Sequence, residues 1–182
     1  ASGAGKSTLL HILGTLDQPD QGQITLNEKV LLTMRRNELA HFRNQHIGFI
    51  FQFHNLLPEF SAVENVCIPG YLGNGPTKNV EKKAKDLLDL LGLSDRLDHK
   101  PSEMSGGELQ RIAVARALIN DPLIVFADEP SGNLDSKNAE DLHKLFFRLK
   151  DELAQTFVIV THNRKLAAMA DRQLEIKDGR IV

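Results

Sequence analysis

Two patterns of apolar and polar residues alternate in the last third of the chain. Short apolar runs of strand length are separated there by segments in which apolar residues recur at helical spacing. The predicted order is a strand at 123–127, a helix at 138–153, a strand at 156–161, a helix at 164–170 and a strand at 173–177. This alternation predicts an α/β fold in which a mostly parallel sheet is flanked by helices.

The preceding residues are predicted to be more helical. The pattern predicts helices at 7–16 and 37–43, strands at 23–27 and 47–51, a capping box that opens a helix at Ser61, a loop at 70–77, and helices at 80–91 and from Ser105. A chain of 182 residues suffices for one domain with a sizeable core. We therefore expect a single domain over 1–182 with a helical subdomain at about 61–120.

Composition excludes several classes of protein. Lys plus Arg number 22 against 24 Asp plus Glu, without a long run of either sign, so no nucleic-acid partner is expected. A single cysteine, Cys67, excludes an internal disulfide and is expected to be buried. The longest apolar runs are far shorter than a membrane span, and no signal peptide is recognisable.

The first candidate for chemistry is at the start of the chain. Gly5-Lys6-Ser7 matches the end of the pattern G-x-x-x-x-G-K-[ST], in which backbone N–H groups and the lysine bind phosphates and the hydroxyl meets Mg²⁺. The following helix would add its N-terminal positive end. The first glycine of the pattern and the strand before it are expected upstream of Ala1. The same residues also suit an ordinary helix N-cap.

The second candidate is the pair Asp128-Glu129, which follows the buried strand predicted at 123–127. Ligands of parallel sheets bind outside the carboxyl ends of the strands, so both carboxylates are expected beside the phosphate loop. Asp128 could then hold Mg²⁺ opposite Ser7, and Glu129 could polarise the attacking water as a general base. The alternative is that the pair only caps the segment before Pro130.

The third candidate begins at Ser105. Ser105 and Glu108 form a capping box, but a cap does not require the two consecutive glycines Gly106 and Gly107. These glycines would let backbone N–H groups approach an anion such as a terminal phosphate.

Together these motifs make the chain resemble the ATP-binding cassette (ABC) family. The signature of that family is Leu-Ser-Gly-Gly-Gln, for which this chain has Met104 in place of leucine and Glu108 in place of glutamine. The remaining motifs follow in family order: the phosphate loop, the Q-loop at Gln52, the signature, the Asp128-Glu129 strand, the D-loop at 131–135 and the switch histidine His162. Without the family, His162 would be interpreted as structural.

The resemblance implies that the chain binds and hydrolyses ATP with Mg²⁺. It implies Glu129 and His162 as catalytic residues, and Ser7, Gln52 and Asp128 as metal-site residues. The implied ATP-binding residues are Ser2, Gly3, Ala4, Gly5, Lys6, Ser7, Thr8, Gln52, Ser105, Gly106, Gly107, Glu108 and Asp135. It further implies a head-to-tail homodimer of cassettes, and an adenine-stacking aromatic residue upstream of Ala1.

A narrower resemblance concerns the transport function. Residues 51–66, 128–135 and 172–180 are similar to the ATPases of bacterial lipoprotein-releasing transporters. This implies permease subunits as partners, membrane contact only through them, and a peripheral position on the cytoplasmic face of the inner membrane. The alternatives are a macrolide-exporter or cell-division ABC ATPase, a non-transport ABC ATPase, or a P-loop kinase.

The segment after Gln52 is a candidate docking surface. Phe53, Leu56, Leu57 and Phe60 fit neither helical nor strand periodicity, so some of them are expected near the surface. The resemblance implies that they line a groove for a short helix of the permease. The alternative is that all four pack beneath the helical subdomain.

Overall fold

The computed structural model describes residues 4–73 and 77–182, and its centre is a parallel sheet. The strands β3 (Ile47–Phe51), β4 (Ile124–Asp128) and β5 (Phe157–Val160) lie in the order β3-β4-β5. Both pairings are parallel, with Phe49 opposite Phe126 and Phe126 opposite Val158. This sheet confirms the predicted α/β class.

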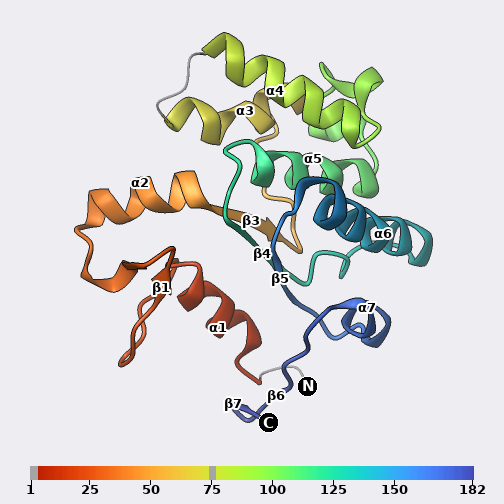
Figure 1. The fold of residues 1–182 in the computed structure, drawn as a ribbon. Helices are drawn as coiled ribbons and strands as arrows, with labels where there is room; N and C mark the ends of the chain where they lie inside the picture. The colour runs from red at the N-terminus through yellow and green to blue at the C-terminus, as the bar shows by residue number, and fades with distance from the viewer. Residues whose placement is uncertain (1–3, 74–76) are drawn as a thin grey trace.

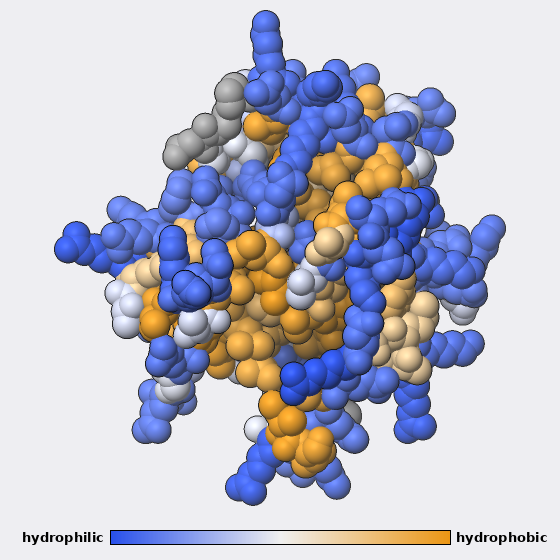
Figure 2. Space-filling model, in the orientation of Figure 1, coloured by the Kyte–Doolittle hydropathy of each residue, from blue (hydrophilic) through white to orange (hydrophobic). Residues whose placement is uncertain are grey.

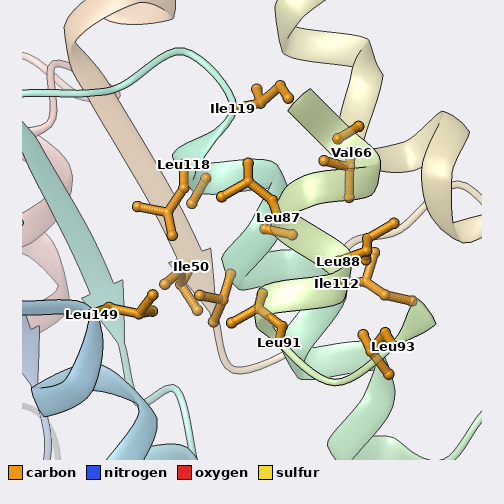
Figure 3. Close-up of a cluster of buried hydrophobic side chains, with 14 of the residues drawn as sticks. Ile50, Val66, Leu87, Leu88, Leu91, Leu93, Ile112, Leu118, Ile119 and Leu149 are labelled. Carbon is orange, nitrogen blue, oxygen red and sulfur yellow. The ribbon is translucent and has the colours of Figure 1, made fainter. Parts of the chain in front are cut away.

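Alternate residues of each strand point to opposite faces of the sheet. Ile50, Val125 and Ala127 belong to the larger buried cluster, which they share with α3 (Ala62–Leu72), α4 (Thr77–Leu90), α5 (Gly106–Leu118) and α6 (Ser136–Leu153). Figure 3 shows part of this cluster, with Ile50 from the sheet among leucine and isoleucine side chains from the helices. The short helices η2 (Ser94–Arg96) and η3 (Pro101–Glu103) connect α4 to α5.

The opposite face of the sheet carries a second buried cluster. Ile47 and Phe126 pack there with Leu10 of α1 (Lys6–Leu13), Leu31 of η1 (Leu31–Thr33) and Phe42 of α2 (Arg36–His46). Helices therefore cover both faces, as the sequence predicts, and Figure 1 shows α1 and α6 on either side of the strands. The helix α7 (Arg164–Met169) follows β5.

The strand predicted at 173–177 does not join this sheet. Its last two residues form β6 (Ile176–Lys177), which pairs antiparallel with β7 (Arg180–Ile181). Asp178 and Gly179 between them have φ of 48° and 74°, values typical of a two-residue hairpin turn. The predicted strand at 23–27 is likewise reduced to a hairpin of β1 (Thr25–Leu26) with β2 (Lys29–Val30).

The predicted loop at 70–77 is also wrong in part, because α3 continues through Pro69 and Gly70 to Leu72. The carbonyl of Pro69 accepts hydrogen bonds from the Asn44 and Asn120 side-chain amides and from the N–H of Gly73. These donors satisfy a carbonyl of the last turn, and α3 ends at Leu72 with Gly73 as its C-cap.

The surface combines charged residues with exposed apolar ones. Figure 2 shows apolar residues gathered in the middle of one face, with polar residues around them. In the part of the chain that the structure describes, every helix is too short or too polar to cross a membrane.

Candidate active site

The site forms where α1 begins, at the carboxyl end of β4. Ile124 and Phe126 of β4 face the cluster that contains α1. Side chains of a strand alternate between its two faces, so the side chain of Asp128 is also on the α1 side. There the hydroxyl of Ser7 donates a hydrogen bond of 2.9 Å to Oδ1 of Asp128. The predicted meeting of the phosphate loop with the strand end is therefore present.

The phosphate-loop residues lead directly into α1. Gly5, at φ 87°, precedes the helix, and Lys6 is its first residue. Ala4 is buried, whereas Ser7 and Thr8 are exposed in the first turn. Ser2 and Gly3 lie outside the described residues. The first turn of α1 contains no acidic residue, so its N–H groups and Lys6 give this end of the helix a positive potential suited to an anion.

Glu129 and His162 face each other just beyond the carboxyl ends of β4 and β5. Nδ1 of His162 lies 2.9 Å from Oε2 of Glu129, and the N–H of Glu129 donates to the carbonyl of Val160. Glu129 has φ 44°, an uncommon conformation for a residue other than glycine. Its side chain is 19% exposed and that of His162 is 76% exposed, so both can reach a ligand in the crevice. The pair has the arrangement of a general base oriented by a second polar group.

Gln52 is hydrogen-bonded to a residue of the loop that follows Glu129. Its Nε2 donates to Oδ1 of Asn133 at 2.9 Å, and Nδ2 of Asn133 donates back to the Gln52 carbonyl at 3.3 Å. Gly132 lies against the Gln52 side chain, and a Cβ at position 132 would be 2.9 Å from Nε2 of Gln52. Among the described residues, the Gln52 side chain is therefore hydrogen-bonded to the 131–135 loop rather than to Ser7 or Asp128.

The predicted capping box at Ser105 is present at the start of α5. Glu108 accepts hydrogen bonds from the N–H and the hydroxyl of Ser105, and a further one from Nε of Arg96. These bonds, those from Ser105 foremost, lower the pKa of Glu108 to about 2. The carboxylate is thus ionised and used within its own helix cap, whereas Ser105 and Gly106 are exposed.

Gly107 lies close to a residue of α6 within its own chain. A Cβ at this position would lie 2.6 Å from Oδ1 of Asn138, so the glycine allows α5 to pack against the first turn of α6. Asp135 caps that turn by accepting hydrogen bonds from the N–H and the side-chain amide of Asn138. The described contacts of Gly107 and Asp135 therefore join two helices of the same chain.

His11 is a site residue that the sequence analysis missed. Its Nε2 lies 3.8 Å from Oδ2 of Asp128, and its ring packs edge-on against Phe51. The spacing from Ser7 to His11 is i, i+4, which places both side chains on one face of α1. This spacing, together with the predicted approach of Asp128 to Ser7, is the sequence signal that could have placed His11 at the site.

The donor set at Ser7 and Asp128 fits Mg²⁺. Mg²⁺ is bound in nucleotide sites by one or two protein oxygens, with water and phosphate oxygens completing its coordination. The hydroxyl and the carboxylate lie within hydrogen-bond distance of each other and supply such oxygens.

The segment after Gln52 presents apolar side chains at the surface. Phe53, Leu57 and Phe60 are 69%, 44% and 40% exposed, whereas Leu56 packs against the larger core cluster. The alternative in which all four are buried beneath the helices is therefore wrong.

Polar side chains from two helices hold this segment in place. Arg116 of α5 donates to the carbonyls of His54 and Asn55, at 2.8 and 2.6 Å. Fully buried Gln110 donates to the Phe51 carbonyl and contacts Nδ1 of His54. Asn65 of α3 accepts from the N–H of Leu57 and donates to its carbonyl. The exposed apolar residues thus lie on a fixed backbone.

Comparisons with known proteins agree with these observations. The family model described as ABC transporter matches residues 1–132. The lipoprotein-releasing system ATP-binding protein LolD of Cytophaga hutchinsonii is 63% identical over 182 residues, which is 100% of this chain and 83% of that protein. LolD of Bacteroides fragilis is 56% identical over 181 residues, covering 100% of this chain and 84% of that protein.

Solved structures share the fold. The dimeric post-hydrolysis state of the ATP-binding cassette MJ0796 bound to ADP and Pi matches with a TM-score of 0.88 and 38% identity. That match covers 100% of this chain and 80% of the cassette. A second dimeric structure of MJ0796, a bacterial ABC transporter cassette, matches with a TM-score of 0.88 and 39% identity.

Proposed function

The chain belongs to the ABC transporter family, and we propose that it is the ATP-hydrolysing subunit of a transporter that releases lipoproteins from the inner membrane. The observation that carries the ATPase assignment is the hydrogen bond between Ser7 and Asp128. It joins a phosphate-binding helix start to a carboxylate at the end of a buried strand. The lipoprotein assignment is supported by the 63% and 56% identity to the LolD proteins.

Each side chain of the site has a proposed role in hydrolysis. Lys6 and the N–H groups at the start of α1 bind the phosphates of ATP, because they present positive charge to the crevice. Glu129 accepts a proton from the attacking water, and His162 orients that carboxylate and contacts the terminal phosphate.

Mg²⁺ would be held by Ser7 and Asp128, and when bound it neutralises charge on the phosphates. His11 stands 3.8 Å from Asp128 and helps to orient the carboxylate. Gln52 acts at this site only if its amide leaves Asn133, so we assign it a role in communication rather than in the resting metal site.

The exposed start of α5 supports the proposal of a dimer. Ser105 and Gly106 present the helix N-terminus to solvent, where it can bind the terminal phosphate of a nucleotide on a second subunit. The MJ0796 cassette, 38% identical, is a dimer in both matched structures. We infer a head-to-tail homodimer in which Ser105, Gly106 and Gly107 complete the partner's site.

The surface formed by Phe53, Leu57 and Phe60 is the proposed docking site for a permease. Exposed apolar side chains on a fixed backbone suit the apolar face of a short helix from another protein. The protein would then lie at the cytoplasmic face of the inner membrane and contact the membrane through the permease alone.

Two measurements test this function. The purified protein should hydrolyse ATP in the presence of Mg²⁺, and from native membranes it should co-purify with an integral membrane subunit. Co-purification with nucleic acid or ribosomes in place of a membrane subunit would contradict the transport assignment.

A further inference from the structure

A buried histidine lies behind the loop that connects Glu129 to α6. His143 is 5% exposed on α6, and its Nε2 lies 3.0 Å from Oγ of Ser131. Ser131 is the second residue after Glu129, and none of the roles proposed above uses His143. A polar ring placed among core residues and aimed at this loop requires a physical explanation.

The loop itself is a tight turn with few internal bonds. The N–H of Gly132 donates to the carbonyl of Glu129 at 2.9 Å, and the N–H of Leu134 donates to the carbonyl of Ser131 at 3.2 Å. Gly132 and Asn133 are exposed, so packing does little to hold this part of the chain. Leu134 packs against the larger core cluster near the end of the turn, and the bond between Ser131 and His143 joins the first half of the turn to the buried face of α6.

Two proposed functional groups depend on this turn. At its start, Glu129 is held in a left-handed conformation with its carboxylate 2.9 Å from His162. At its middle, Asn133 exchanges two hydrogen bonds with Gln52, which adjoins the docking segment. A displaced turn would therefore move the carboxylate and break the contact with Gln52.

We propose that His143 is a positioning residue that holds the turn of residues 129–135 in place through the hydroxyl of Ser131. In this position the turn places Glu129 beside His162. It also places Asn133 beside Gln52. Its catalytic consequence rests on the proposed function. The placement of the turn does not, so the two can be tested separately.

The first experiment measures ATP hydrolysis. His143→Phe keeps a ring without the hydrogen bond, Ser131→Ala removes the hydroxyl, and Ser131→Thr restores a hydroxyl. We expect the first two to lower kcat at least about tenfold with little change in KM, because a displaced turn moves the carboxylate of Glu129, whereas the N–H groups proposed to bind the phosphates belong to the start of α1. The double variant Ser131→Ala/His143→Phe should be no slower than the slower single variant, and Ser131→Thr should retain most of the activity.

Leu149→Val, which shortens a buried side chain of the same helix, is the control for a general loss of stability.

The second experiment measures amide hydrogen exchange of residues 129–135 in the nucleotide-free protein. Exchange should be faster in His143→Phe and Ser131→Ala, and unchanged in Ser131→Thr and Leu149→Val. Unchanged exchange in the first two variants, or an equal loss of kcat in Leu149→Val, would overturn the positioning role. If exchange responds as expected while the unmodified protein hydrolyses no ATP, the proposed function fails and the positioning role stands.

Discussion

The hydroxyl of Ser7 and the carboxylate of Asp128 are hydrogen-bonded at 2.9 Å, although 121 residues separate them in the chain. The contact forms because α1 lies against β4 and because alternate residues of that strand face the helix. Ser7 is exposed and Asp128 is only partly buried, so burial alone does not explain the pairing. The contact defines the crevice on which the next prediction depends.

Lys6→Ala should weaken ATP binding itself. The lysine stands at the N-terminus of α1, and its removal takes away positive charge from the proposed phosphate site. Equilibrium titration with ATP should show at least about a tenfold higher Kd, which corresponds to about 1.4 kcal/mol. Lys82→Ala, at an exposed position of α4, is the matched control and should bind ATP normally. Equal affinity in both variants would contradict the phosphate-binding role.

Leu57→Glu and Phe60→Glu should separate hydrolysis from assembly. Both side chains are about 40% exposed, so a carboxylate there should leave the fold and basal ATP hydrolysis largely unchanged. It should abolish assembly with the membrane subunit and the resulting stimulation, because an apolar helix cannot pair with the charge. Co-purification and ATPase assays of the assembled complex measure these effects. Leu153→Glu, at a comparably exposed leucine on α6, should assemble normally. A Leu57→Glu protein that assembles and is stimulated would place the docking site elsewhere.

Arg116→Met should destabilise the protein by about 1–3 kcal/mol, because it leaves the carbonyls of His54 and Asn55 without their donors. Denaturant unfolding measures the change. Arg36→Met, at an exposed position of α2, should differ little from the unmodified protein. A loss below about 0.5 kcal/mol would show that Arg116 does not hold the docking segment.

Stability should fall as the pH drops below about 6.5. Burial lowers the pKa of His143 and of His46 below 6.5, so the unfolded chain takes up these protons first. The free energy of unfolding should therefore decrease from pH 6.5 down to the folded-state pKa values, and these two groups should cause no further decrease below them. The slope is limited to about 1.4 kcal/mol per pH unit for each histidine. Urea unfolding at several pH values should show a smaller slope for His143→Phe, and an unchanged slope would contradict burial of a neutral ring.

Much of the fold could be predicted because its signals are local. The apolar runs at 47–51 and 123–127 are strands, and the capping boxes at Ser61 and Ser105 open helices as expected. The approach of Ser7 to Asp128 followed from a general property of parallel sheets. The hairpin at 176–181 was missed because its turn signal, Asp178-Gly179, received less weight than the strand and helix alternation.

The remaining features of the site depend on tertiary contacts. The side chains of Gln52 and Asn133 meet only because β3 and β4 are neighbours in the sheet. No pattern in the sequence around either residue predicts that the two form a hydrogen bond. The same holds for His143 and Ser131, where a histidine within a helical pattern could equally have faced solvent. The last turn of α3 is likewise capped by side chains from distant segments, because the Pro69 carbonyl accepts from Asn44 and Asn120, which lie 25 and 51 residues away in the sequence.

The most direct test of the proposed mechanism is the single-turnover rate of ATP hydrolysis by Glu129→Gln compared with the unmodified protein, both at saturating ATP and Mg²⁺. Glutamine keeps the size of the side chain but cannot accept the proton from water. The account predicts that Glu129→Gln binds ATP with unchanged affinity, accumulates as a nucleotide-bound dimer and hydrolyses ATP about 10²- to 10⁴-fold more slowly. Near-normal turnover by Glu129→Gln would contradict it.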